Sequence, residues 1–401
     1  MTGSDSTGPE GNRFVALCTG ATGISSVHLI RRLQQDSRFS KVYGVSRREL
    51  YDVDTANVQH IKLDLLDSQK VKDELKAKGV SDVTHLYQNA FVFSGDDTKD
   101  IEINFGMHKN VIEGLEAAGS PLQHVYFNAG GKWYGQAIGP MKTPCHESDP
   151  RHMPPNFYYN MQDYCDERRH DGAKWTWSSL RPDPVAGVSR GSYMNIAVSI
   201  ALYATMCKEQ HIPLRFPGSD FAWNAVNDVT DVDLLSEASI HVSTNKQCQN
   251  QAYNINNGDL FRWKDLWPKI AKHFRMETGP NLHMDLVSIM NTPDKKELWA
   301  KTVKKYGLEQ TSWDELATWP FADFVFNQPS DWFQNCNKLK QTGFDGMKVD
   351  TDQMYLRLFR EMAQKRFIPN YEDEGKPLGG PVQVEGRGTP ALPGAESASI
   401  E

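Results

Sequence analysis

The first half of the chain alternates short apolar runs with stretches in which apolar residues recur every three or four positions. Phe14 to Cys18 is an unbroken apolar run, which is typical of a strand buried on both faces. After a glycine-containing turn, apolar residues recur at helical spacing from Ile24 to Leu33. Further strands are predicted at 41–45, 60–64, 83–87, 123–128 and 175–180, with helical patterns between several of them, such as 107–115. This rhythm predicts an α/β fold with a doubly wound parallel Rossmann sheet.

The second half of the chain is less regular and richer in helical patterns, which fall at 156–168, 195–207, 263–274, 294–305 and 350–365. We expect residues 12–195 to form a dinucleotide-binding Rossmann core. Residues 196–369 are expected to supply the remaining core strands and a smaller, mostly helical C-terminal substrate lobe. The segments 1–11 and 370–401 are small, polar and rich in glycine, serine or proline, so both are predicted to be disordered.

Composition narrows the function classes. A net charge of −7 argues against a nucleic acid partner, because such partners are bound by basic surfaces. No apolar run is long enough to span a membrane, and the N-terminus lacks the apolar core of a secretory signal. The six cysteines show neither C-x-x-C nor metal-ligand spacing. These features predict a cytoplasmic protein with reduced thiols, no bound metal and a small-molecule substrate.

A phosphate-binding turn is predicted directly after the first strand. Gly20-Ala-Thr-Gly23 lies between that strand and the first helix, where glycine lets the backbone approach a pyrophosphate and the helix N-terminus offers free N–H groups. Ser26 stands where the usual fingerprint has a third glycine, so we expect slightly looser packing of helix on strand there. The alternative interpretation is a simple tight turn with no ligand.

The end of the second strand indicates which dinucleotide would bind. Arg47 and Arg48 follow it, and guanidinium groups suit the 2′-phosphate of NADPH better than a bare ribose hydroxyl. A pair of solvated surface arginines is the alternative. Asp64 and Leu65, at the end of the third strand, are expected beside the adenine, although an acid at a strand end also serves as a cap.

None of the fourteen tyrosines has a lysine four residues later, so the Y-x-x-x-K pair of short-chain dehydrogenases is absent. The chain instead reads Asn128-Ala-Gly-Gly-Lys132-Trp133-Tyr and, later, Asn156-Phe-Tyr158-Tyr159. Further motifs follow in order, among them Trp175-Thr-Trp-Ser-Ser-Leu-Arg-Pro182 and Ser189-Arg-Gly-Ser192-Tyr-Met194-Asn195. This ordered set, over roughly residues 14–369, resembles the progesterone 5β-reductase/iridoid synthase family of atypical extended short-chain dehydrogenases/reductases.

The resemblance implies a catalytic pair and a set of cofactor contacts. The family's catalytic tyrosine and lysine fall on Tyr158 and Lys132, with Tyr159 as a competitor better suited to packing within its helix. The cofactor contacts fall on Thr22, Gly23, Ile24, Arg47, Arg48, Asp64, Leu65, Asn128, Val185, Ser192 and Met194. The resemblance also implies a tendency to form homodimers. Trp133 replaces the family's histidine, and Ala90-Phe91 replaces its threonine–tryptophan, so these departures put the substrate in doubt.

The chemistry implied is NADPH-dependent 1,4-reduction of an enone or enal. A phenol at Tyr158 would hydrogen-bond the oxygen that becomes negative, and Lys132 would hold the nicotinamide ribose and lower the Tyr158 pKa. Carbonyl reduction by the same pair, a non-redox cyclase or isomerase, and an NADPH-binding sensor remain as alternatives. Candidate apolar walls for a terpenoid, steroid or polyketide-like substrate are Phe91, Trp133, Phe321 and Phe326, although such residues also fill ordinary cores.

Overall fold

The computed structural model describes residues 13–372, apart from 55, 137, 154 and 317. The predicted disordered segment 1–11 and most of the predicted tail, 373–401, lie outside the described residues. The packed part of the chain extends beyond residue 369, because Tyr371 is buried against Phe274. The predicted start of the tail at residue 370 is therefore too early.

A parallel seven-stranded sheet in the order β3-β2-β1-β4-β5-β6-β9 forms the centre of the first lobe. Its order reverses at β1, as in doubly wound dinucleotide-binding folds. The predicted fold class is confirmed. The strands are β1 (Phe14–Thr19), β2 (Phe39–Ser46), β3 (Val58–Lys62), β4 (His85–Gln88), β5 (His124–Asn128), β6 (Thr176–Pro182) and β9 (Gln251–Ile255).

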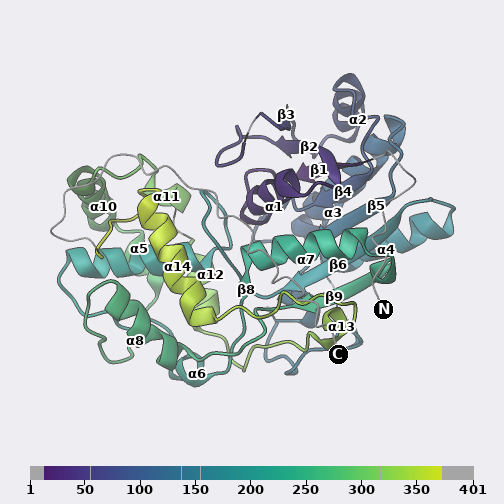
Figure 1. Ribbon diagram of the computed structural model, residues 1–401. Helices are drawn as coiled ribbons and strands as arrows, with labels where there is room; N and C mark the ends of the chain where they lie inside the picture. Colours follow the sequence, from purple (N-terminus) through teal and green to yellow (C-terminus); the bar gives the residue numbers. More distant parts are fainter. Residues whose placement is uncertain (1–12, 55, 137, 154, 317, 373–401) are drawn as a thin grey trace, which may run out of the picture.

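Helices cover both faces of this sheet (Figure 1). One face carries α1 (Ile24–Gln35) and α7 (Val232–Thr244). Their apolar residues, among them Leu29 of α1 and Leu235 of α7, belong to one buried cluster. The other face carries α2 (Ser68–Ala77), α3 (Asp97–Ala117) and α4 (Phe157–His170), which share a second cluster. β1 is mostly apolar and buried on both faces, and β4 is buried along its length although it contains His85 and Gln88.

A second lobe, mostly helical, lies beside the sheet and has a core of its own (Figure 1). The long apolar helix α5 (Ile196–Glu209) passes through it, and Phe216, Trp263 and Trp267 pack around that helix. A two-stranded sheet of β7 (Val185–Ala186) and β8 (Thr230–Asp231) lies at the junction. The other elements are η1 (Gly131–Tyr134), α6 (Asp220–Asn224), η2 (Lys246–Cys248), α8 (Trp263–His273), α9 (Leu286–Met290), α10 (Pro293–Tyr306), α11 (Trp313–Leu316), α12 (Trp319–Phe326), α13 (Asn337–Lys340) and α14 (Thr351–Gln364).

The carboxyl ends of β1, β2, β4, β5 and β6 meet along one edge of the sheet, facing the helical lobe. Ligands of open α/β sheets bind at this edge, next to the point where the strand order reverses. Within the described residues, no helix is long and apolar enough to cross a bilayer.

Candidate functional site

A cavity of about 940 Å³ opens along the carboxyl edge of the sheet and continues under the helical lobe. Loops from the ends of β1 to β6 line it, together with residues of α4 and α12. Every residue that the sequence analysis assigns to the cofactor lies in the wall of this cavity. These residues are Gly20, Thr22, Gly23, Ile24, Arg47, Arg48, Asp64, Leu65, Asn128, Val185, Ser192 and Met194. The fold therefore brings these distant segments to one site.

The turn after β1 passes unusually close to the end of β4. Gly20 has a φ of +61°, and a Cβ added there would lie 2.9 Å from the Ala90 Cα, closer than real Cβ atoms come. Gly23 caps the N-terminus of α1 without a side-chain hydrogen bond, and the first turn of the helix lines the cavity. The Ile24 N–H donates to the Ser192 hydroxyl at 3.0 Å. Such a helix start is suited to a phosphate, because unpaired N–H groups and the helix dipole both favour an anion.

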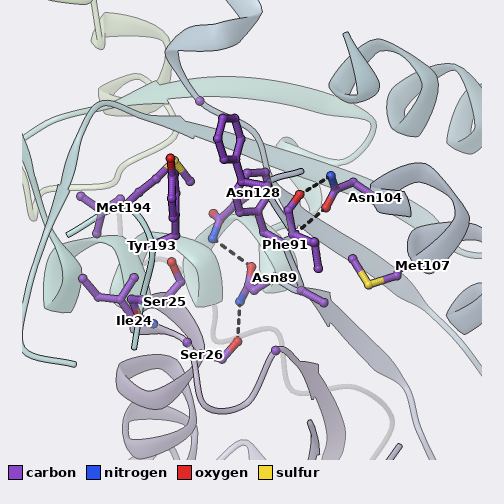
Figure 2. Close-up of a pocket in the computed structure, with 18 of the residues that line it drawn as sticks. Ile24, Ser25, Ser26, Asn89, Phe91, Asn104, Met107, Asn128, Tyr193 and Met194 are labelled. Atoms are coloured by element: carbon purple, nitrogen blue, oxygen red, sulfur yellow. Dashed lines mark hydrogen bonds between the residues drawn. The ribbon is translucent and has the colours of Figure 1, made fainter. Parts of the chain in front are cut away.

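Ser26 has a role that the sequence interpretation missed. Its hydroxyl donates to the Thr19 carbonyl at 2.7 Å and accepts from the Asn89 amide at 3.2 Å. The Asn89 side-chain oxygen in turn accepts from Asn128 Nδ2 at 2.9 Å, which extends the chain of hydrogen bonds across three strand ends (Figure 2). Ser26 is fully buried, so it joins α1 to the strands instead of loosening their packing. The available signal for Asn89 was a polar residue directly after a buried strand.

The two arginines line the cavity where β2 ends. Arg47 and Arg48 are exposed, and Arg48 Nη2 donates weakly to Thr22 Oγ1 at 3.4 Å. Across the described residues, no salt bridge occupies either guanidinium group. Asp64 accepts from the Leu66 N–H at 3.1 Å, and Leu65 is buried beside it. This end of the cavity therefore offers two cations next to an apolar floor, which fits a phosphorylated adenosine.

Lys132 and Tyr158 lie at the other end of the cavity and are held by one residue, Asn156. The Asn156 side-chain oxygen caps α4 by accepting from the Tyr158 N–H at 3.1 Å, and its amide donates to the Lys132 carbonyl at 2.8 Å. The Lys132 ammonium forms an ion pair with Asp97 at the start of α3. Two residues 26 positions apart in the sequence thus border the same space.

The Tyr158 phenol is kept in its neutral form. Burial raises its pKa, and the nearby carboxyl groups of Asp183 and Asp100 raise it further. The expectation that Lys132 lowers this pKa is wrong, because the ammonium pairs with Asp97 instead of the phenol. At neutral pH the group is therefore a hydrogen-bond donor and not a base.

The predicted substrate walls divide into two groups. Phe91 and Phe321 line the cavity, whereas Trp133 and Phe326 do not. Trp133 is buried between the Arg181 guanidinium, 3.7 Å from its ring centroid, and the edge of Tyr159. Phe326 packs in the helical lobe against Phe216 and Trp263. Both residues belong to the core, because aromatic type alone does not distinguish a wall from a core position.

Tyr159 is a packing residue. Its hydroxyl donates to the Trp133 carbonyl at 2.7 Å and accepts from the His152 N–H at 3.2 Å. It is absent from the cavity wall, which leaves Tyr158 as the only tyrosine of the pair that borders the cavity within the described residues.

Several residues of the substrate end were not singled out from the sequence. Phe93 and Tyr193 come from loops on opposite sides and stack with ring centroids 4.7 Å apart. Tyr193 and Met194 lie above Ile24 and Ser25 in Figure 2. Asn104, at the inner wall, exchanges hydrogen bonds with the Val92 backbone. The remaining wall residues include Met107, Gln136, Met161, Asp183, Phe324 and Trp332.

Comparison with known proteins agrees with this geometry. A family model described as a PRISE-like Rossmann-fold domain matches residues 16–369. The chain belongs to this family. The resemblance to the progesterone 5β-reductase/iridoid synthase family is thereby confirmed. An (S)-8-oxocitronellyl enol synthase of Catharanthus roseus is 33% identical over 371 residues, which cover 89% of this chain and 93% of the relative.

A further relative and a solved structure are consistent with this family and its fold. The enol synthase ISY1 of Nepeta cataria is 32% identical over 350 residues, covering 85% of this chain and 89% of the relative. Among solved structures, UDP-glucose 4-epimerase of Thermotoga maritima aligns with a TM-score of 0.61 at 15% identity, covering 87% of this chain and 99% of that one. A likeness at that identity shows the fold alone. This PRISE-like chain is thus a Rossmann protein of an oxidoreductase family.

The neutral state of Tyr158 can be tested by ultraviolet titration. Its pKa is raised, so the phenol keeps its proton below the folded pKa and ionises only above the range near 10 that is usual for tyrosine. We expect the wild type and Tyr158→Phe to gain the same tyrosinate absorbance up to about pH 10. An additional ionisation step in the wild type below that pH would contradict the assignment.

Proposed function

We propose that the protein is an NADPH-dependent reductase that saturates the C=C bond of an apolar enal or enone. The observation that supports this most directly is the neutral Tyr158 phenol at one end of a cavity whose other end is lined by the Gly20 turn, Arg47 and Arg48. The terpenoid, steroid or polyketide-like character of the substrate is suggested by the apolar side chains of Phe91, Phe321 and Phe324 around that phenol.

The choice of NADPH over NADH rests on Arg47 and Arg48. Both follow β2, both line the cavity, and neither is neutralised by a carboxylate in the described part of the chain. Two such guanidinium groups can bind the 2′-phosphate with paired hydrogen bonds. The N-terminus of α1 and the turn at Gly20 would hold the pyrophosphate, since a side chain at residue 20 would fill the space that the backbone needs.

When bound, NADPH supplies the hydride. The protein's own contribution begins with Tyr158, whose O–H is positioned to hydrogen-bond the substrate carbonyl oxygen. As the β-carbon accepts the hydride, negative charge develops on that oxygen, and the hydrogen bond becomes stronger than it is to the neutral carbonyl. A neutral phenol suits this task, because a phenolate would repel the developing charge.

Lys132 has two possible partners in this scheme. In the structure its ammonium is paired with Asp97. We propose that it exchanges this partner for the nicotinamide ribose when the cofactor binds, which would keep a positive charge beside the reacting centre. The names of the relatives support enolate chemistry, because an enol is the protonated form of the enolate that hydride addition to an enal creates.

The proposal is tested by following NADPH oxidation with a panel of cyclic enones, linear enals and matching saturated ketones. We expect oxidation with the enones and enals, saturated carbonyl products, and little oxidation with the ketones. Allylic alcohols as products would indicate carbonyl reduction. Tight NADPH binding with no turnover on any member of the panel would contradict a reductase.

Tyr158→Phe tests the role of the phenol. Removing one donor to a developing oxyanion is expected to lower kcat by about 10²–10³-fold. The dissociation constant for NADPH should remain unchanged, because the hydroxyl is assigned to the substrate. Tyr159→Phe is the matched control, since it removes the neighbouring hydroxyl outside the cavity and should keep turnover. Full activity of Tyr158→Phe would refute the assignment.

The double variant Arg47→Ala/Arg48→Ala tests cofactor selectivity. Loss of charge-assisted hydrogen bonds worth about 1.5–3 kcal/mol should weaken NADPH binding roughly 10–100-fold. Binding of NADH should change little, because it has no 2′-phosphate. Arg32→Ala removes a charge from the exposed side of α1, where Arg32 pairs with Glu237, and serves as the control. Equal losses for both cofactors would show that the arginines do not read the phosphate.

A further inference from the structure

A second acid lies next to Tyr158 at the substrate end of the cavity. Asp183, between β6 and β7, lines the cavity and is only 3% exposed. A Cβ added to Gly131 would lie 2.6 and 2.7 Å from its two carboxyl oxygens. A Cβ added to the preceding Gly130 would lie 3.6 Å from the Tyr158 hydroxyl. The phenol and the carboxyl group therefore abut consecutive residues, whose Cα atoms are about 3.8 Å apart.

The hydrogen bonds to Asp183 come from uncharged groups. The Trp332 indole N–H donates to Oδ2, Gln334 Nε2 donates to the same oxygen at 3.4 Å, and Gln136 Nε2 donates to Oδ1 at 3.4 Å. No salt bridge to Asp183 occurs among the described residues. An ionised carboxylate without a cation is costly to bury, so the neutral acid is the favoured form.

The titratable groups near Asp183 also favour its protonated form. Asp228, Tyr158 and Cys145 are the groups that interact electrostatically with Asp183, and each is negative when ionised. Asp228 is itself buried and lies outside the cavity wall. Burial and the Asp228 carboxyl together hold the pKa of Asp183 well above its usual range. These surroundings favour the protonated carboxyl group of Asp183, which presents an O–H group.

We propose that Asp183 is a catalytic acid that delivers a proton to the α-carbon of the substrate after hydride addition. The proposal rests on the proposed enone or enal reduction. There the β-carbon gains a C–H bond, the C=C bond is lost, and an enolate forms whose oxygen is held by Tyr158. The Asp183 O–H bond then breaks, its proton bonds to the α-carbon, and the enolate electrons reform C=O. The carboxylate takes a proton back from water, so each turnover consumes one hydride and one solvent proton.

A purely structural role makes a different prediction. If Asp183 only anchors Trp332, an asparagine of the same size provides an equivalent acceptor, and the reaction should be unaffected. Asparagine cannot deliver a proton at neutral pH. Asp183→Asn therefore separates the two roles. Asp231→Asn is a matched control, because Asp231 is also a buried acid but lies outside the cavity wall and pairs with Arg357.

The test uses 2-methylcyclohex-2-enone and 2-methylpent-2-enal, whose reduction creates a stereocentre at the α-carbon. With the wild type we expect one configuration at this carbon, measured by chiral gas chromatography at early reaction times. Asp183→Asn should bind NADPH with unchanged affinity, lose about 10²-fold in kcat and give both α-configurations, because solvent then protonates the released enolate. Asp231→Asn should retain the selectivity of the wild type. Unchanged rate and selectivity in Asp183→Asn would overturn the proposal.

A second variant and a second readout cover failure of folding and failure of turnover. Asp183→Ala should regain rate and selectivity when formate buffer is added, because formic acid can replace the missing carboxyl group. Absence of rescue in a folded variant counts against the proposal. The infrared difference between wild type and Asp183→Asn at neutral pH should show a protonated carboxyl carbonyl band. A carboxylate band would overturn the proposal whatever the activity. The wild type could show this band and yet oxidise NADPH with none of the tested substrates. In that case the proposed function and the catalytic role of Asp183 are both wrong, but Asp183 is still a neutral acid.

Discussion

The site depends on how closely the turn after β1 approaches the end of β4. Gly20 adopts a φ of +61°, and any side chain there would collide with the backbone at Ala90. This approach lets Ser26, Asn89 and Asn128 join the ends of β1, β4 and β5 through hydrogen bonds. The strand ends are thereby fixed relative to the start of α1. The two arginines after β2 and the Lys132 segment after β5 consequently line the same cavity.

The two ends of the cavity have opposite electrostatic character. One end of the cavity carries Arg47 and Arg48, which are exposed and form no salt bridge within the described residues, and this arrangement is suited to recognising a phosphate in water. At the other end the side chains of Tyr158 and Asp183 are buried, and this burial raises the pKa of both groups. Because Lys132 is paired with Asp97, no cation in the described structure counteracts that effect at the phenol. The result is a pair of neutral acids in an apolar space, which favours donation of hydrogen bonds and protons to a substrate that becomes negative during reaction.

Much of the fold could be predicted from the sequence because each feature is local. The first six strands and the glycine turn are apparent from apolar runs and from residues that suit tight turns. β9 was not identified as a strand, since its Asn254 is buried through hydrogen bonds to the Cys145 and Asn335 carbonyls, which only the tertiary fold supplies. The residues expected to contact the cofactor could be chosen because family motifs mark their positions, and all of them line the cavity.

Other features could not be predicted because they depend on contacts between distant segments. The burial of Trp133, in η1, follows from its contact with Arg181, which lies on β6. The direction in which the Tyr158 pKa shifts depends on which carboxyl groups lie near the phenol and on which carboxylate pairs with Lys132. Asp183 itself follows an ordinary arginine–proline pair, and its raised pKa arises from burial of its carboxyl group and from the nearby Asp228 carboxyl. The spacing of residues along the sequence does not indicate these tertiary contacts.

The central claim is that a neutral Tyr158 phenol and a bound nicotinamide meet at one end of the cavity. A crystal structure of the protein with NADP⁺ tests this most directly. We expect the pyrophosphate at the start of α1, the 2′-phosphate at Arg47 and Arg48, and the nicotinamide within reach of both Tyr158 and Asp183. A dinucleotide bound elsewhere, or one whose nicotinamide is separated from the Tyr158 hydroxyl, would contradict the account.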